Sequence, residues 1–168
     1  NLERYKEFLK INKCEINAFF SEFYQSGSFA LQDPDNNMIC FGVLKKENNF
    51  LTKGIYAPLQ HLTFASKDVE KFQNFYQKKL GFQVTDRVVK STGELAACFT
   101  TSNHEHHTIA CFKSSQNGMD HHSYEAGEWN NIKIWCDHFA QNNIKLMWGP
   151  GRHLSLIHIS EPTRRAII

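Results

Sequence analysis

The sequence predicts an α+β fold of two successive βαβββ modules, the first truncated at its N-terminal side and the second at its C-terminal side. Three observations predict it. The apolar pattern after residue 58 reads strand, helix and three strands. The pattern before residue 45 reads helix and three short strands. Finally, residues 7–16 and 137–146 each run from a helix end through Asn into a strand, which suggests a repeat of about 130 residues.

The part before residue 57 supplies the helix and the hairpin that would close an earlier module. Leu2, Tyr5 and Leu9 fall at helical spacing, and Pro34 lies in an Asp- and Asn-rich turn between two apolar runs. We therefore expect a helix at residues 2–13, strands at 14–19, 28–32 and 38–44, and a polar linker at 45–56.

The second module opens with a strand at residues 59–65, after which Ser66 is a plausible N-cap and Asp68 suits the first helical turn. A helical apolar stripe follows and ends at Gly81; its members are Val69, Phe72, Phe75, Tyr76 and Leu80. Further strands are expected at 82–89, 94–100, 107–112, 120–124 and 145–148. A helix is expected at 130–142, with Ile134, Trp135, His138 and Phe139 on its inner side.

Three regions follow from these patterns: residues 1–53 as the C-terminal half of a first module, 54–153 as an incomplete second module, and 154–168 as a tail. The tail begins LSLIHISEPTR, which matches the conceptual translation of a sequencing adapter. We expect it to be non-native and exclude it from fold reasoning. The chain starts at Asn1 within a helical pattern, so we interpret it as an internal fragment.

Composition excludes several classes of protein. A formal net charge of +2 is too small to indicate a nucleic-acid partner, and no apolar run approaches the length of a membrane span. The five cysteines are scattered and include no Cys-x-x-Cys pair. Reduced thiols in a cytoplasmic protein are therefore expected, with no nucleic-acid or membrane partner.

The candidate functional residues of this sequence are histidines. Strand alternation places His61, His107 and His121 where each can project from one concave sheet face, and imidazole is the commonest neutral metal ligand. Each of them taken singly is more often a hydrogen-bonded, partly buried residue than a metal ligand. We expect His104 and His106 to decorate a solvated loop and His122 and His138 to be structural, and His158 falls in the tail.

The joint pattern resembles a known family. QHLTF at 60–64 with FYxxxLGF at 75–82 looks like the opening of a vicinal oxygen chelate module. HTIA at 107–110, DHHSYE at 120–125 and GPGRH at 149–153 look like the second module of type I extradiol ring-cleavage dioxygenases. These belong to the glyoxalase/bleomycin resistance/dioxygenase superfamily. The resemblance covers residues 2–153, and the preceding hairpin at 29–41 fits it.

Carried over residue by residue, the resemblance makes His61 and His121 iron ligands and His107 the acid–base histidine. We prefer His121 to His122 on strand parity and on its distance from Trp129. His153 corresponds to a histidine near the substrate. A third ligand, a Glu, and a nearby Tyr would follow His153 and are missing from this chain; Glu125 and Glu128 are poor substitutes.

The resemblance implies an Fe(II) enzyme, with Mn(II) possible, that cleaves a small catecholic diol with O2 and forms a homo-oligomer when full length. We expect the 168-residue chain itself to be inactive because it lacks the third ligand. Two alternatives stay open. One is another metalloenzyme of the superfamily, a glyoxalase-type isomerase or an antibiotic thiol transferase; the other is a metal-free drug-binding module.

Overall fold

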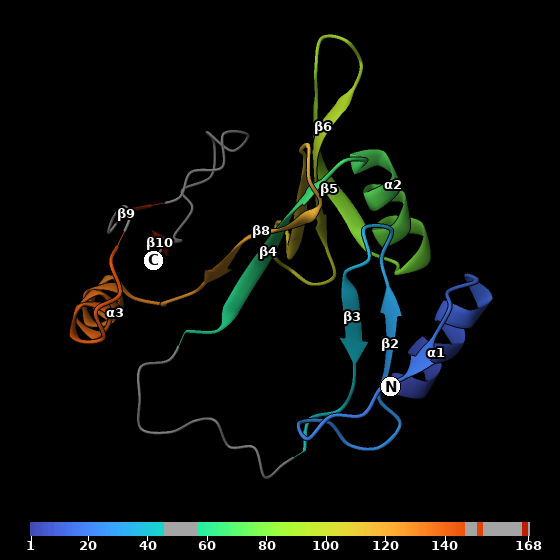
Figure 1. The fold of residues 1–168 in the computed structure, drawn as a ribbon, viewed down its shortest axis with the longest axis horizontal. Helices are drawn as coiled ribbons and strands as arrows, with labels where there is room; N and C mark the ends of the chain where they lie inside the picture. Colours follow the sequence, from blue (N-terminus) through green and yellow to red (C-terminus); the bar gives the residue numbers. More distant parts are fainter. Residues whose placement is uncertain (46–56, 147–150, 153–165, 168) are drawn as a thin grey trace. The chain divides into compact units, whose positions relative to one another are not determined.

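The computed structural model describes residues 1–45, 57–146, 151–152 and 166–167 (Figure 1). The chain divides into two compact units, the first made of residues 1–50 and 62–121 and the second of residues 51–61 and 122–168. Both are described separately below. The predicted boundary at residues 53 and 54 lies outside the described residues, so the division into modules and tail stays a prediction.

The largest sheet has five strands in the order β5-β6-β7-β4-β8. Strand β4 pairs with β7 in parallel, whereas β6 is antiparallel to both β5 and β7. One helical segment follows β4 along the chain, so the order strand, helix and three strands confirms the predicted βαβββ pattern. The bounds of the five strands are Leu59–Ser66 (β4), Gln83–Val89 (β5), Leu95–Thr101 (β6), Ile109–Lys113 (β7) and Gly118–Tyr124 (β8).

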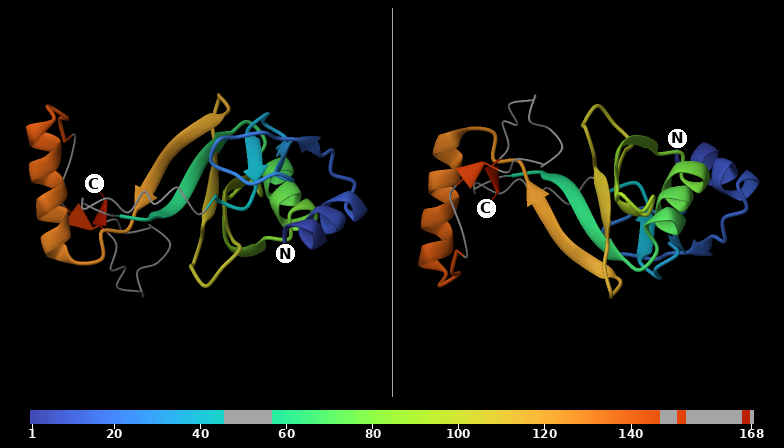
Figure 2. Two further views of the ribbon diagram at one scale, coloured as in Figure 1. Left: turned by 90° about the horizontal axis from the view of Figure 1, so that it is seen from below. Right: turned by 90° about the horizontal axis from the view of Figure 1, so that it is seen from above.

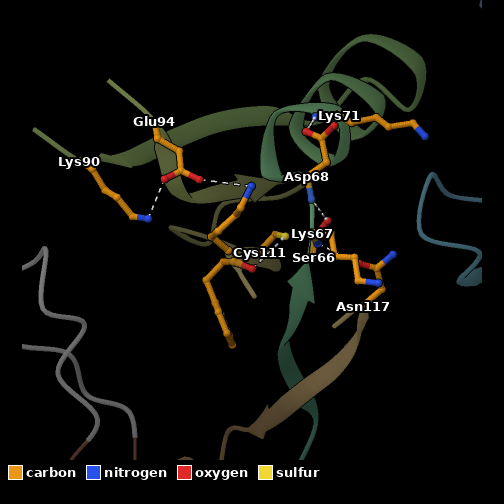
Figure 3. Close-up of polar contacts among 10 residues, drawn as sticks. Ser66, Lys67, Asp68, Lys71, Lys90, Glu94, Cys111 and Asn117 are labelled. Atoms are coloured by element: carbon orange, nitrogen blue, oxygen red, sulfur yellow. Dashed lines mark hydrogen bonds and ion pairs between the residues drawn. The ribbon is translucent and has the colours of Figure 1, made fainter. Parts of the chain in front are cut away.

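The N-cap of helix α2 (Val69–Asn74) lies two positions after the one that the sequence suggested. Its N-cap is Asp68, whose carboxylate accepts the Lys71 N–H at 2.9 Å (Figure 3). Ser66 is still part of β4, where it pairs with Lys113. The prediction of Ser66 as the cap was wrong because its backbone belongs to the sheet. Its hydroxyl instead accepts the Asp68 N–H at 3.0 Å and supports the turn between the two elements.

The predicted single helix changes geometry after Asn74. Residues Phe75–Lys79 form a π-helical turn (η1), closed by a bond from the Leu80 N–H to the Phe75 carbonyl. Gly81 then adopts φ +81° and ends the helical segment, as predicted. Despite the wider turn, Tyr76 and Leu80 remain fully buried in the main core. The apolar stripe therefore fixes which face is buried, although it does not reveal the π geometry.

The N-terminal part of the chain packs against this helical segment within the first unit (Figure 2). The Tyr5 hydroxyl donates to the Leu80 carbonyl at 2.8 Å, and the Tyr76 hydroxyl donates to Asp33 at 3.2 Å. Leu9 and Phe29 are completely buried in the same core. The elements are α1 (Leu2–Ile11), β1 (Asn17–Ala18), β2 (Phe29–Gln32) and β3 (Met38–Phe41), and the three strands form an antiparallel sheet.

Polar contacts hold the ends of the strands in the first unit (Figure 3). Glu94 bonds to Lys90 at 2.7 Å and to Lys113 at 3.2 Å, which links the start of β6 to the end of β7. The Asn117 side chain accepts the Lys67 N–H at 2.8 Å. Because these ion pairs are exposed, they fix geometry more than they stabilise the fold.

The second unit contains helix α3 (Trp129–Gln141), whose buried side packs on Ala126 through Ile132. The prediction that Ile134 faces inward was wrong, because that side chain is 41% exposed and Ile132 takes the buried position. The predicted strand at 145–148 is not seen at residues 145–146, and its other half lies outside the described residues. Two further short strands, β9 (Gly151–Arg152) and β10 (Ala166–Ile167), pair in antiparallel fashion.

No helix among the described residues is long and apolar enough to cross a bilayer. All five cysteines carry free thiols, in agreement with the sequence. Two of them, Cys98 and Cys111, lie opposite each other on β6 and β7 and belong to the core.

Candidate functional site

His61 is the third residue of β4 and is buried, with 4% of its surface exposed. Its Nδ1 atom bonds to the side-chain Oε1 of Gln60, the preceding residue. A carboxamide oxygen accepts hydrogen bonds only, so Nδ1 of His61 carries the proton. The nitrogen with the lone pair is therefore Nε2, which is the arrangement typical of metal-binding histidines.

His107 is also buried, at 7% exposed, but it does not lie in a strand. The prediction of a strand from residue 107 was wrong: β7 begins at Ile109, so the parity argument does not apply to His107. The polar loop before β7 extends two residues further than its apolar pattern suggested. The ring is held instead by edge-to-face packing on Phe99 at 5.2 Å between centroids. Its Nδ1 atom lies 2.9 Å from Nδ1 of His106.

His121 lies in β8, where its Nδ1 atom is 2.6 Å from the carboxylate of Asp120. Along this strand His121 and Ser123 occupy the more buried face, whereas His122 and Tyr124 are exposed. The His122 ring packs edge-to-face on Tyr124 at 5.2 Å. The two neighbouring histidines therefore differ in partner: His121 bonds to a carboxylate and His122 contacts an aromatic ring.

The same local device recurs at all three predicted site histidines. In each case Nδ1 bonds to the side chain of the residue immediately before, namely Gln60 for His61, His106 for His107 and Asp120 for His121. Carboxylate and amide partners of this kind fix the tautomer and the orientation of an imidazole. Sequence reasoning missed these three residues. The signal that could have found them is a hydrogen-bonding side chain directly before each histidine.

The predicted site provides two of the ligands that a divalent metal requires. Two imidazoles whose Nε2 atoms keep the lone pair are suitable ligands for Fe(II) or Mn(II). Among residues 1–45 and 57–146, however, no group of three His, Cys, Asp or Glu side chains is placed to hold a metal ion. Glu125 and Glu128 are exposed, and Glu128 precedes α3 as its N-cap residue. The predicted His153 lies outside the described residues.

The strands that carry the two predicted ligands are neighbours in the sheet order, in which β8 follows β4. His61 belongs to the second compact unit and His121 to the first. The convergence of these two imidazoles on one metal ion therefore stays a prediction. His106 differs from its prediction: it is half-buried and contacts both Phe99 and His107, while His104 is exposed as expected.

An aromatic cavity of about 420 Å³ lies within the second unit. Its lining is apolar apart from the His122 ring and the Tyr124 hydroxyl, and the other members are Ala57, Trp135 and Phe139. The Trp135 Nε1–H is buried and makes no hydrogen bond in the described part of the chain. A flat aromatic ring would fit the chemistry of these walls.

Comparison with known proteins identifies the class to which this fold belongs. The Glyoxalase/Bleomycin resistance protein/Dioxygenase superfamily matches residues 59–156. Because this match spans more than half of the chain, the chain belongs to that superfamily. The expected resemblance and the expected α+β fold class are thus both confirmed, whereas the truncation of the two modules stays a prediction.

Three particular proteins similar to this chain are a metapyrocatechase and two 2,3-dioxygenases. The chain is 27% identical over 96 residues to metapyrocatechase 2 from Cupriavidus necator. It shares its fold with the 2,3-dioxygenase LapB from Pseudomonas sp. KL28, at a TM-score of 0.73 and 20% identity over 90% of this chain. A variant of homoprotocatechuate 2,3-dioxygenase from B. fuscum matches at a TM-score of 0.69, again at 20% identity over 90% of this chain.

The chain spans only part of each relative. It covers 29% of metapyrocatechase 2, 59% of the Pseudomonas dioxygenase and 45% of the B. fuscum dioxygenase. At these identities the structural likeness establishes the fold. The activity, substrates and partners of the whole protein are therefore proposals.

Proposed function

We propose that the protein containing this chain is an extradiol dioxygenase, which cleaves the aromatic ring of a catecholic substrate with O2. The observation that carries the proposal is the set of three histidines, each with Nδ1 bonded to its preceding side chain, in a chain of this superfamily. The aromatic cavity of the second unit is compatible with a flat substrate. The similar proteins include metapyrocatechase 2 and homoprotocatechuate 2,3-dioxygenase, whose names support the proposal.

In this proposal His61 and His121 hold Fe(II), or alternatively Mn(II), through their Nε2 atoms. The metal would bring the diol and O2 together and accept negative charge from the substrate oxygens. Gln60 and Asp120 hold the two rings in the required tautomer by accepting from Nδ1. A third, carboxylate ligand is not provided by the described residues, and we expect the 168-residue chain alone to show no turnover.

His107 is the proposed acid–base residue. Its burial and its packing on Phe99 keep the imidazole in one orientation. A histidine has an ordinary pKa of about 6.5, so it can accept a proton from a bound diol and later return it near neutral pH. His153 would lie near the same substrate. The full protein would act in the cytoplasm as a homo-oligomer, without nucleic-acid or membrane partners.

Metal analysis of a longer protein that contains this chain tests the proposal. We expect one bound iron per site, lost in His61→Gln and in His121→Gln, and retained in the control His138→Gln on exposed α3. The variant His122→Gln decides between the neighbouring histidines. Iron lost in His122→Gln and kept in His121→Gln would transfer the ligand role to His122. No bound metal with all histidines intact would instead support the metal-free binding module.

Turnover distinguishes the remaining enzyme class. A coloured ring-cleavage product from catechol, formed with consumption of O2, would support the dioxygenase. A metal-loaded protein that isomerises a thiol adduct without consuming O2 would support a glyoxalase-type enzyme and contradict this proposal.

A further inference from the structure

The strongest unassigned feature of the first unit is the contact between His106 and His107. Their Nδ1 atoms lie 2.9 Å apart, and their rings meet edge-to-face, with an interplanar angle of 86°. Two neutral imidazoles at this distance must share one proton, because two Nδ1 lone pairs repel each other and two Nδ1–H groups would collide. One ring is therefore a donor and the other an acceptor, and the choice fixes the tautomer of both.

We propose that His106 is a positioning residue for His107: its Nδ1 accepts the Nδ1–H of His107, and so leaves Nε2 of His107 as the basic nitrogen. This inference rests on the proposed role of His107 as the acid–base residue. In effect His106 does for His107 what a carboxylate does for the histidine of a catalytic triad, although with a neutral acceptor.

Burial favours this direction of the hydrogen bond. His106 is half-buried, so its Nε2–H is able to bond to water while its Nδ1 accepts. His107 is 7% exposed, so the one N–H of its neutral ring requires an acceptor inside the protein. His106 provides that acceptor directly when the proton is on Nδ1. The opposite direction would place the proton on Nε2 of His107, where the nitrogen could no longer take a proton from the substrate.

The proposed direction gives His107 the same tautomer as the other two predicted site histidines. Asp120 can only accept from Nδ1 of His121, and the Gln60 oxygen can only accept from Nδ1 of His61. Phe99 adds the geometric restraint, since both rings of the pair pack on it, at 5.9 Å for His106 and 5.2 Å for His107. Rotation of either ring would break an aromatic contact as well as the hydrogen bond. The pair is thus held in one arrangement.

The tautomer of His107 is directly measurable in the 168-residue chain by long-range ¹H–¹⁵N correlation spectra. The measurement is made well above the ordinary histidine pKa of about 6.5, and His107→Gln assigns the signals. We expect the wild-type His107 to carry its proton on Nδ1. A proton on Nε2 in the wild type would overturn the proposal, whatever the variants show.

Variants of His106 test the cause. His106→Asp retains a group that can only accept, so we expect the Nδ1–H tautomer of His107 to persist. His106→Leu removes the acceptor, and we expect the Nε2–H form to appear. Exposed His104, changed to Leu, is the matched control in the same loop and should leave the spectrum unchanged. An unchanged His107 tautomer in His106→Leu would refute the positioning role.

Activity provides the second readout. In a longer, active protein we expect His106→Leu to lower kcat by about 10- to 100-fold at unchanged KM, with most of the loss recovered in His106→Asp. Full activity in His106→Leu would contradict the proposal. If the wild type shows no ring cleavage, the proposed function fails, but the tautomer result stands by itself. The two failures are therefore distinguishable.

Discussion

The carboxylate of Asp120 lies 2.6 Å from Nδ1 of His121, the residue directly after it in β8. A carboxylate acceptor at this position keeps the proton on Nδ1 of His121 and fixes the ring orientation. We therefore predict that Asp120→Asn weakens iron binding in a longer protein by about 10- to 100-fold. Metal titration measures the effect. Exposed Asp137 in α3, changed to Asn, is the control and should bind iron like the wild type.

The buried carboxylate of Asp33 is predicted to stabilise the first unit. It accepts the backbone N–H groups of Asp35 and Asn37 at 2.9 and 2.8 Å, the Asn37 side chain at 2.8 Å and the Tyr76 hydroxyl at 3.2 Å. Tyr76→Phe removes one of these donors, and we expect a loss of about 1–3 kcal/mol in the free energy of unfolding. Urea denaturation measures it.

Two comparisons sharpen that experiment. Asp33→Ala removes the shared acceptor and should cost more than Tyr76→Phe, because several buried donors lose their partner at once. Tyr124→Phe alters a hydroxyl on a side chain that is 44% exposed, and should change stability by less than about 0.5 kcal/mol. Equal stability of all three variants would show that the Asp33 network contributes nothing.

Stability is predicted to fall at alkaline pH. Burial, together with the nearby negative charge of Asp33, raises the pKa of Tyr76 far above its ordinary value of 10.0. The folded state therefore keeps the phenol protonated, while the unfolded state releases the proton above about pH 10. The contribution of Tyr76 to the free energy of unfolding is therefore complete below about pH 10 and is lost as the pH rises further.

Burial also raises the pKa of Tyr5 and of the Cys14 thiol, so their contributions have the same sign. Denaturation measured from neutral pH to about pH 11 should show a declining free energy of unfolding, with a weaker decline in Tyr76→Phe. An identical slope in this variant would mean that Tyr76 ionises equally in both states.

Gly81 is predicted to be required for stability, both because of its backbone conformation and because Phe8 lies close to it. Its φ of +81° disfavours any side chain, and a Cβ there would lie 3.2 Å from Cζ of Phe8. Gly93 has a similar φ of +84°, with nothing within 4 Å of its Cβ position. Its substitution by Ala therefore measures the loss of stability that comes from the backbone conformation alone. We expect Gly93→Ala to lower stability by about 1 kcal/mol and Gly81→Ala by more.

Thermal denaturation of both variants measures the difference. Phe8→Leu combined with Gly81→Ala should recover the part that comes from the close contact, because the shorter side chain leaves room for the new methyl group. Equal losses in the two single variants would show that Phe8 moves aside at no cost.

The sequence by itself determined the order of the elements and suggested the histidines of the predicted site. Apolar periodicity is a local property, so it was sufficient to predict β4, α2 and the three strands that follow, together with the buried face of Tyr76 and Leu80. The histidines were likewise visible from their spacing. The true cap at Asp68 was missed because only pairing with β7 shows that Ser66 still belongs to a strand.

Only the tertiary structure decided how each imidazole is held. A histidine has two ring nitrogens, and the sequence does not say which one bears the proton; a partner within hydrogen-bond reach does. For the three predicted site histidines, these partners are Gln60, His106 and Asp120. The late start of β7, which leaves His107 in a loop and against Phe99, is equally a result of packing and strand pairing. The contact of His107 with Phe99 arises from side chains meeting in space, which residue spacing does not encode.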